Sequence, residues 1–392
     1  MKKIRIFALA SFLLTVSVAA AAPYGFSHGP YLQELTPTGV TFVFTTSDKG
    51  FSWVELRSPE GEITRHYAVK DGLRDAYNTF CTIRTDSLRP ATAYDYRLCS
   101  KRIDDFQPYR VTFGDSIVSR WYAFRTPDPR SEECSFVALS DMHGDSAKLA
   151  RLLALAGVES ADRIFYVGDM MNYFVRPEQP YESFIDVSVD RFAKHKPFAV
   201  VRGNHETRGA LARTYDRYIH NNPEGRYYGF YTFGDTAVVM LDCGEDKPDS
   251  HDVYAGFAAF DEYREQQAAW LREVVKSKEF RRARHRIVMI HIPPVDERMA
   301  EQDPATVKEM LEWRGNEHWG RLLLPVLNGA KIDALFSAHQ HSFHLLPALK
   351  GVHDFPIVVN DNKSAMLIRC DAEGVRVRIT DIDGREIMDR TL

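Results

Sequence analysis

Residues 163–172 read RIFYVGDMMN, in which the apolar run from Ile164 to Val167 is followed by a glycine and an aspartate and, three residues later, an asparagine. Residues 198–206 have the same pattern in FAVVRGNHE, and residues 135–145 have it in SFVALSDMHGD. Short apolar runs bounded by turn residues are typical of buried β-strands. Each of these strands is therefore predicted to end in a cluster of carboxylate, imidazole or amide side chains.

Two later apolar runs end in the same way, because Ile287 to Ile290 precedes His291, and Ala334 to Phe336 precedes His339 and His341. Amphipathic stretches with apolar residues at three- and four-residue intervals predict helices. They cover residues 146–156, 210–219, 263–278 and 317–327. Strands interspersed with helices predict an α/β domain. Ligands collect at the carboxyl ends of strands in such domains, so the polar clusters are expected to meet.

The first third of the chain has a different pattern, in which short strand-like runs are separated by turn residues. They cover residues 40–45, 52–57, 63–69, 77–83, 94–99 and 121–124. Pro127 and Pro129 then mark a linker. We therefore predict two folded domains, a small all-β sandwich over residues 23–127 and an α/β catalytic domain over residues 131–392.

A proline turn from Leu88 to Ala91 leads into the predicted strand that contains Tyr94 and Tyr96. A tyrosine hydroxyl at this position can bond back to the preceding loop. The arrangement resembles the tyrosine corner of fibronectin type III domains, which implies a domain of that type. The alternative is another β-rich module with a proline-containing turn.

The N-terminus begins with Lys2, Lys3 and Arg5, continues with the apolar run from Ile6 to Val18, and then has an alanine tract that ends at Ala22. This layout is typical of a secretory signal peptide. A membrane anchor is disfavoured because the apolar run is shorter than the ~20 residues that span a bilayer. We expect residues 1–22 to direct export, to the periplasm or outside the cell, with no membrane span after cleavage.

The 50 basic and 54 acidic side chains give a formal net charge of −4. No nucleic-acid partner is expected, and a small phosphorylated substrate has to be bound by local charge. The five cysteines have no metal-ligand spacing. Cys81 and Cys99 either form a disulfide in an oxidising compartment or remain buried thiols. The oligomeric state is left open, a dimer included.

The side chains at the predicted strand ends are suited to a catalytic metal centre. Carboxylate oxygens and imidazole nitrogens bind zinc, iron or manganese, whereas a set without thiolates argues against a structural zinc site. Asp169 is placed to bridge two ions. Water between two such ions loses its proton near pH ~7 rather than ~15.7, which supplies hydroxide as a nucleophile.

In their order along the chain, the five polar clusters resemble those of the calcineurin-like metallophosphoesterases, and the β-domain ahead of them makes the layout similar to that of purple acid phosphatases. The resemblance implies a four-layer αββα sandwich with mixed sheets and two divalent or trivalent metal ions, zinc, manganese or iron. It implies that the first ion is bound by Asp141, His143, Asp169 and His341, and the second by Asp169, Asn204, His291 and His339. It also implies that Asn204 and His205 bind the substrate phosphate, and that His205 protonates the departing oxygen.

The sequence departs from the purple acid phosphatases after Asp169. Those enzymes have a metal-binding tyrosine three residues later, where this chain has Asn172, and they lack the histidine that stands here at position 143. An imidazole in place of the phenolate favours zinc, manganese or ferrous iron. Asn172 is expected to orient His205. Ala338 replaces a glycine of the relatives, which is expected to change only local packing.

We therefore expect an exported enzyme that hydrolyses phosphate esters, phosphomonoesters first, by attack of metal-bound hydroxide. The alternatives are a phosphodiesterase that uses the same site and a catalytically idle exported binding protein. The complete ligand set favours an enzyme. Long segments after the motif-bearing strands, residues 171–187, 243–259 and 293–315, are expected to form the pocket walls.

Overall fold

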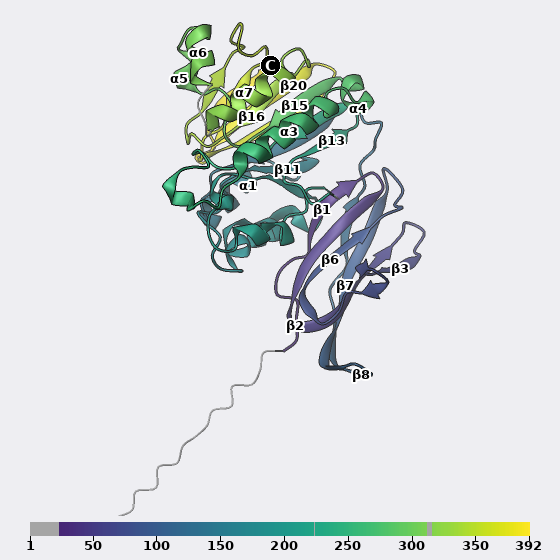
Figure 1. The fold of residues 1–392 in the computed structure, drawn as a ribbon. Helices are drawn as coiled ribbons and strands as arrows, with labels where there is room; N and C mark the ends of the chain where they lie inside the picture. The colour runs from purple at the N-terminus through teal and green to yellow at the C-terminus, as the bar shows by residue number, and fades with distance from the viewer. Residues whose placement is uncertain (1–22, 223, 312–315) are drawn as a thin grey trace, which may run out of the picture.

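The computed structural model describes residues 23–222, 224–311 and 316–392. The predicted signal peptide, residues 1–22, lies outside the described residues. A β-rich part precedes an α/β part, and the two lie end to end in Figure 1. No helix within the described residues is long and apolar enough to cross a membrane.

The β-rich part is organised around one long strand, β2 (Gly39–Arg57), which pairs with neighbours along both of its halves. The sequence predicted two strands here, at residues 40–45 and 52–57. They are continuous because Gly50 pairs with Asn78 on one neighbour and with Arg102 on another, which keeps the intervening polar stretch extended. The remaining strands are β1 (Tyr31–Thr36), β3 (Ile63–His66), β4 (Val69–Lys70), β5 (Leu73–Arg74), β6 (Asn78–Thr85), β7 (Ala93–Gln107), β8 (Arg110–Val118) and β9 (Tyr122–Arg125).

The predicted bond at the proline turn is present. The backbone N–H of Arg89 donates to the hydroxyl of Tyr94 at 3.0 Å. The two cysteines of this part, Cys81 and Cys99, are buried free thiols and do not form a disulfide with each other. Both thiols have pKa values raised to about 11 by burial, which keeps them protonated.

The α/β part contains two six-stranded mixed sheets within the described residues. The first runs in the order β12-β11-β10-β19-β20-β21, with the first three strands parallel to one another and the last three added antiparallel. These strands are β10 (Cys134–Leu139), β11 (Arg163–Val167), β12 (Phe198–Val201), β19 (Ser364–Asp371), β20 (Gly374–Asp381) and β21 (Glu386–Thr391).

The second sheet runs in the order β13-β14-β15-β16-β18-β17, with four central parallel strands and an antiparallel strand at each edge. Its strands are β13 (Gly229–Phe233), β14 (Thr236–Met240), β15 (His285–Met289), β16 (Ala334–Ser337), β17 (His344–Leu346) and β18 (Ile357–Val359). Buried residues of both sheets, among them Phe136, Phe165 and Met289, form one apolar core between them.

Helices cover the outer faces of the two sheets. Apolar side chains of α1 (Ser146–Leu155) belong to the core on one side, and those of α3 (Phe260–Val274) and α7 (Asn316–Leu327) belong to the core on the other. Figure 1 shows α3 and α7 beside each other over the second sheet. The predicted αββα order of layers is thereby confirmed. Shorter helices are α2 (Asp186–Ser188), α4 (Lys278–Arg282), α5 (Glu297–Ala300) and α6 (Pro304–Met310).

The predicted helix over residues 210–219 is wrong in type, because the structure has a 3-10 helix from Ala212 to Arg217. Leu211 explains the difference. Its N–H donates to the carbonyl of Phe174 at 2.9 Å, a residue of another segment, and the Thr214 N–H donates back to the Leu211 carbonyl at 2.8 Å. The bond to Phe174 ties the start of this segment to another part of the chain, and the bond from Thr214 to Leu211 has the three-residue spacing of a 3-10 helix rather than the four-residue spacing of an α-helix.

The two parts of the chain are joined by buried contacts. The ring of Tyr31, on β1, stacks on Phe198 with centroids 5.7 Å apart, and its hydroxyl donates to the carbonyl of Tyr218 at 3.1 Å. The Tyr96 hydroxyl donates to the carbonyl of Lys194 at 2.8 Å. Tyr31 is fully buried, so its hydroxyl and the carbonyl it serves have lost their contact with water.

Removing the Tyr31 hydroxyl is expected to weaken this junction. Tyr31→Phe leaves the Tyr218 carbonyl buried without its donor, which should lower the free energy of unfolding in urea by about 1–2 kcal/mol. Tyr109→Phe makes the same chemical change at a fully exposed side chain and should have no effect. Equal stability of the two variants would show that the hydroxyl contributes nothing to the junction.

Candidate metal centre

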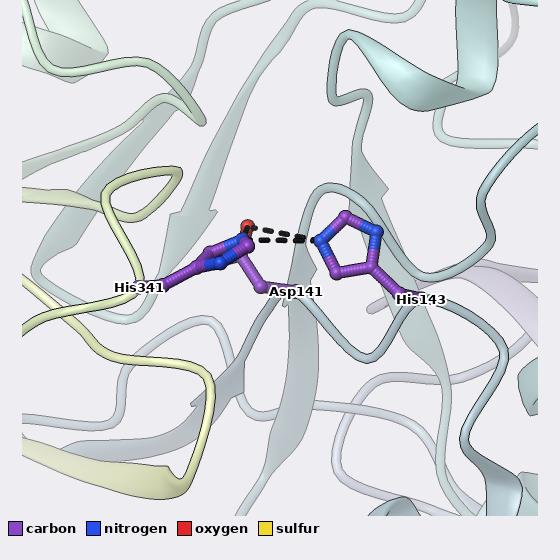
Figure 2. Close-up of side chains that lie close together, drawn as sticks. All are labelled: Asp141, His143 and His341. Atoms are coloured by element: carbon purple, nitrogen blue, oxygen red, sulfur yellow. Dashed lines mark hydrogen bonds and ion pairs between the residues drawn. The ribbon is translucent and has the colours of Figure 1, made fainter.

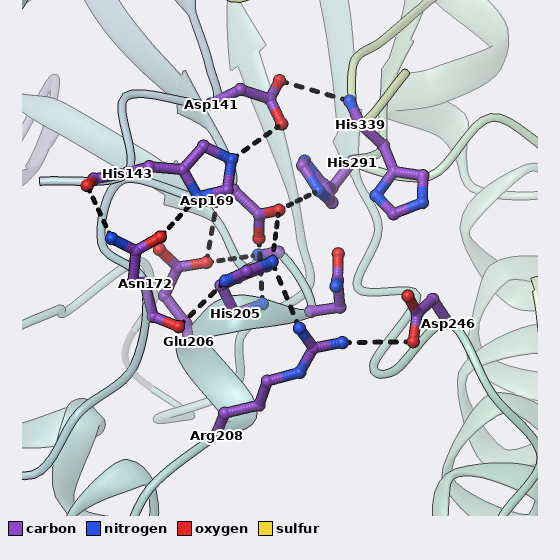
Figure 3. Close-up of polar contacts among 12 residues, drawn as sticks. Asp141, His143, Asp169, Asn172, His205, Glu206, Arg208, Asp246, His291 and His339 are labelled. Carbon is purple, nitrogen blue, oxygen red and sulfur yellow. Dashed lines mark hydrogen bonds and ion pairs between the residues drawn. The ribbon is translucent and has the colours of Figure 1, made fainter. Parts of the chain in front are cut away.

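The predicted site residues lie just after strands of both sheets, where the carboxyl ends of β10, β11, β12, β15 and β16 face one another (Figure 3). Their candidate ligand atoms form three overlapping groups, with all atoms of a group within 4.8 Å of one another. The groups are Asp141, His143 and His341; His143, Asp169 and His205; and Asp169, His291 and His339. The structure thus brings together side chains from across the sequence.

Asp141, His143 and His341 face one another at the first group (Figure 2). The Nε2 atom of His341 lies 3.3 Å from the Oδ1 atom of Asp141 and 3.1 Å from the Nε2 atom of His143. Asp141 is completely buried, whereas His341 is largely open to solvent. One side of this group is therefore accessible.

Asn172 determines which ring nitrogen of His143 carries hydrogen. Its side-chain N–H donates to the carbonyl of His143 at 2.9 Å, so its oxygen is the atom 3.1 Å from His143 Nδ1 and must accept a hydrogen from it. In the neutral ring, Nε2 then has a bare lone pair directed at the group. The Asn172 amide is therefore occupied by His143, and the expected contact of Asn172 with His205 is made by the main chain.

His291 has a similar arrangement on the other side of Asp169. Its Nδ1 atom donates to the carbonyl of Val167 at 2.7 Å, and its Nε2 atom lies 3.1 Å from the Oδ2 atom of Asp169. His291 and Asp169 are both buried. Asp169 belongs to two of the three groups, as does His143, so these two side chains connect the groups.

Several buried atoms at the site make no well-formed hydrogen bond among the described residues, and they are Asp141 Oδ1, Asn204 Oδ1, His291 Nε2 and His339 Nδ1. Asp141 Oδ1 and His291 Nε2 face only another candidate ligand atom, of His341 and of Asp169 respectively. A buried polar atom without a partner costs about 1–3 kcal/mol. All four are atoms that ligate metals, and they come from four different strand ends. The residues therefore fit metal ions as their missing partners.

The electrostatic environment differs among the four candidate imidazole ligands. Burial opposes protonation of His291, but Asp169 raises its pKa to about 10, and the contact with Asp141 raises the pKa of His341, so metal binding there has to release a proton. The other two imidazoles are held neutral. Burial, together with the neighbouring His291, lowers the pKa of His339 to about 4, and burial lowers the pKa of His143. Burial opposes ionisation of Asp169, but His291 and the His205 N–H hold its pKa below the ordinary value. Neutral imidazoles beside an ionised carboxylate are the forms that coordinate a cation.

The backbone at the site is strained at the candidate ligands themselves. Five predicted ligands have positive φ angles of 51–72°, and they are Asp141, His143, Asp169, His339 and His341. Such angles are uncommon for residues with a side chain and cluster at functional sites. A Cβ atom at Gly168 would lie 2.4 Å from the His291 ring, and one at Gly203 would lie 2.3 Å from Asp169. Glycine is required at both positions to let the strand ends approach.

His205 lies at the edge of the groups and is held by two contacts. Its Nδ1 atom donates to the backbone carbonyl of Asn172 at 2.8 Å, and its Nε2 atom accepts from Arg208 Nη1 at 3.1 Å. The Arg208 guanidinium is in turn fixed by Glu245 at 2.9 and 3.1 Å. It is also held by Asp246 at 3.1 Å (Figure 3). Asn172 therefore does orient His205, through its main chain.

Glu206 is a residue whose role the sequence did not reveal. Its buried carboxylate accepts the N–H groups of Asp169 and Gly203 at 2.9 Å and of Met170 at 2.7 Å. Burial and the nearby charge of Asp169 raise the pKa of Glu206 above its ordinary value. The only signal in the sequence was its position directly after His205. The sequence also did not predict the contacts that hold Arg208, because its partners Glu245 and Asp246 lie in a distant segment of the chain.

Comparisons with known proteins agree with this geometry. The purple acid phosphatase PPD1 from yellow lupin (Lupinus luteus) seeds superposes with a TM-score of 0.64 at 14% identity, over 92% of this chain and 73% of that one. PhoD superposes with a TM-score of 0.59 at 12% identity, over 95% of this chain and 94% of that one. No curated protein matches the sequence significantly. At these identities the superpositions show a shared fold.

The sequence pattern that defines the calcineurin-like phosphoesterases matches residues 134–343, which is more than half of the chain. The match begins at β10 and includes every predicted metal ligand. It is independent of the superpositions and of the grouping of ligand atoms. The chain therefore belongs to the calcineurin-like phosphoesterase family and is a metal-dependent phosphoric ester hydrolase.

Proposed function

We propose that the protein is an exported enzyme that hydrolyses small phosphate esters, phosphomonoesters in preference to diesters, with two metal ions. The observation that supports this most is the set of buried ligand atoms without well-formed hydrogen bonds at separate strand ends, within groups that His143 and Asp169 connect. Side chains that served only the fold would have hydrogen-bond partners of their own.

Asp141, His143, Asp169 and His341 are proposed to hold one ion, and Asp169, Asn204, His291 and His339 the other. When bound, the ions supply positive charge for the phosphoryl oxygens and lower the pKa of water to the neutral range. Asn204 and His205 are proposed to bind the substrate phosphate. His205 is proposed to donate a proton to the departing oxygen from Nε2, which requires the ring to take up a second proton on Nε2 in place of the hydrogen bond that it accepts from Arg208, while the Asn172 carbonyl keeps the proton on Nδ1 in place.

Glu206 is proposed to act as a positioning residue. One carboxylate accepts N–H groups from the segment after β11 and from the segment after β12, so it fixes the spacing of Asp169 and Asn204. Residues that orient metal ligands commonly change metal affinity 10- to 100-fold when they are replaced.

The preference for monoesters rests on the overall layout, since a β-rich part precedes the catalytic part as it does in the purple acid phosphatases. A phosphodiesterase that uses the same site is the second candidate. The proposed domains are a fibronectin type III-like domain over residues 23–127 and the phosphoesterase domain over residues 131–392. Residues 1–22 are proposed to direct export to the periplasm or the cell exterior.

Metal analysis combined with phosphate release tests the function directly. The purified protein is expected to contain about two ions of zinc, manganese or iron per chain and to release more phosphate from p-nitrophenyl phosphate than from bis(p-nitrophenyl) phosphate. Chelation should abolish activity, and added metal should restore it. Faster release from the diester would make the protein a phosphodiesterase, and a metal-free, inactive protein that cannot be reconstituted would support the binding-protein alternative.

Replacing His205 separates its proposed role as an acid from a role as a metal ligand. His205→Ala should lower kcat by about 10²–10⁴-fold, as loss of a general acid does, with metal content unchanged. His344→Ala removes an imidazole three residues after His341 that lies outside the described ligand groups, and it should retain full activity. Loss of an ion from His205→Ala would reassign His205 as a ligand.

Replacing Glu206 tests the positioning role. Glu206→Gln places an amide where N–H groups converge, so the free energy of unfolding should fall by about 3 kcal/mol and metal affinity by about 10- to 100-fold. Glu132→Gln makes the same change at an exposed position and should alter neither. Unchanged metal affinity in Glu206→Gln, measured by competition with a chelator, would contradict the role.

A further inference from the structure

A cavity of about 850 Å³ opens beside the metal centre. Its walls come from the segment after His205 and from the segment between β14 and α3, which the sequence predicted as a pocket wall. This volume is within the range of sites that bind whole small molecules. None of the predicted metal ligands lines the cavity, so a phosphate group at the metal centre leaves it free for another part of a substrate.

Arg208 connects the cavity to the proposed acid. Its guanidinium lines the cavity and also contacts His205 Nε2 at 3.1 Å, and Figure 3 shows it between His205 and Asp246. Glu245 and Asp246 prevent it from turning away. Because His205 faces the departing oxygen in the proposed function, the cavity lies on the side of the leaving group.

The cavity walls are rich in aromatic rings. Five aromatic residues line it, and they are Tyr227, Tyr254, Phe257, Phe260 and Tyr263. The Arg202 guanidinium lies over the Tyr227 ring, 4.0 Å from the ring centroid. Phe257 is 77% exposed and Val253 59% exposed, although both are apolar. Apolar side chains that stand exposed around a cavity indicate a surface that is covered when a ligand binds.

The charged groups of the walls largely balance one another. Arg202 is paired with Asp242 at 2.7 Å, and Arg208 with Glu245. Arg213, whose guanidinium lies 5.8 Å from the Phe257 centroid, and Asp216 also line the cavity. Two of the three lining arginines are thus held by carboxylates, and the aromatic surface is the main selective feature of the cavity.

We propose that this cavity binds the leaving group of the substrate and selects one that carries a flat, uncharged aromatic ring, which lies against Phe257 and Tyr254. The proposal rests on the proposed phosphate-ester hydrolysis at the adjoining metal centre. Contacts between aromatic rings contribute about 0.5–1.5 kcal/mol beyond their buried area, so the preference is expected to be moderate.

Two substrates of matched reactivity test the proposal with the metal-loaded enzyme. 2-Phenylethyl phosphate and 2-cyclohexylethyl phosphate release alcohols of similar size and acidity and differ in the flat ring. The wild type should have about a 3- to 10-fold higher kcat/KM for the phenyl substrate, mainly through a lower KM. Phe257→Leu should abolish this preference, and Tyr109→Leu, at an exposed tip far from the cavity in sequence, should keep it.

Equal kcat/KM values for the two substrates, or a preference that survives Phe257→Leu, would refute the cavity proposal while leaving the hydrolase function intact. If neither substrate is hydrolysed, calorimetric binding of the corresponding unreactive phosphonates decides. Tighter binding of the phenyl phosphonate, lost in Phe257→Leu, supports the cavity independently of catalysis. Equal affinities refute it.

Discussion

The buried carboxylate of Glu206 is the contact on which the geometry of the site depends. It draws together N–H groups that follow two neighbouring strands, β11 and β12, and those N–H groups would otherwise be buried without acceptors. Asp169 and Asn204 belong to the two segments that it joins. A negative charge that already satisfies the backbone leaves the adjacent carboxylate of Asp169 free to face the centre between the sheets.

Local patterns in the sequence were sufficient for the strands that hold the site. β11 and β12 lie where they were predicted, because four apolar residues in a row, ended by Gly168 or Arg202, leave few alternatives. The polar side chains of the candidate site could be expected to meet for the same reason, since they follow the ends of these strands. The αββα layers followed from a family resemblance rather than from the residues.

The features that the sequence did not reveal depend on distant contacts. The segment after Leu211 is a 3-10 helix because Phe174 takes its first N–H group. The Asn172 amide bonds to His143 rather than to His205. This depends on how the segments that contain the three residues pack together, which the local sequence does not show. Arg208 is held in place by Glu245, which lies in another segment. Strand β8 was not predicted because apolar and polar residues do not alternate regularly along it.

Strand β19 lies in the middle of the first sheet, between β10 and β20, although it comes from the far end of the sequence. A ribosome therefore delivers β10, β11 and β12 long before their central partner exists. Until Ser364 to Asp371 has emerged, β10 has an unpaired edge of apolar residues, which is open to pairing with other chains. The order of synthesis thus makes completion of the catalytic sheet a late event.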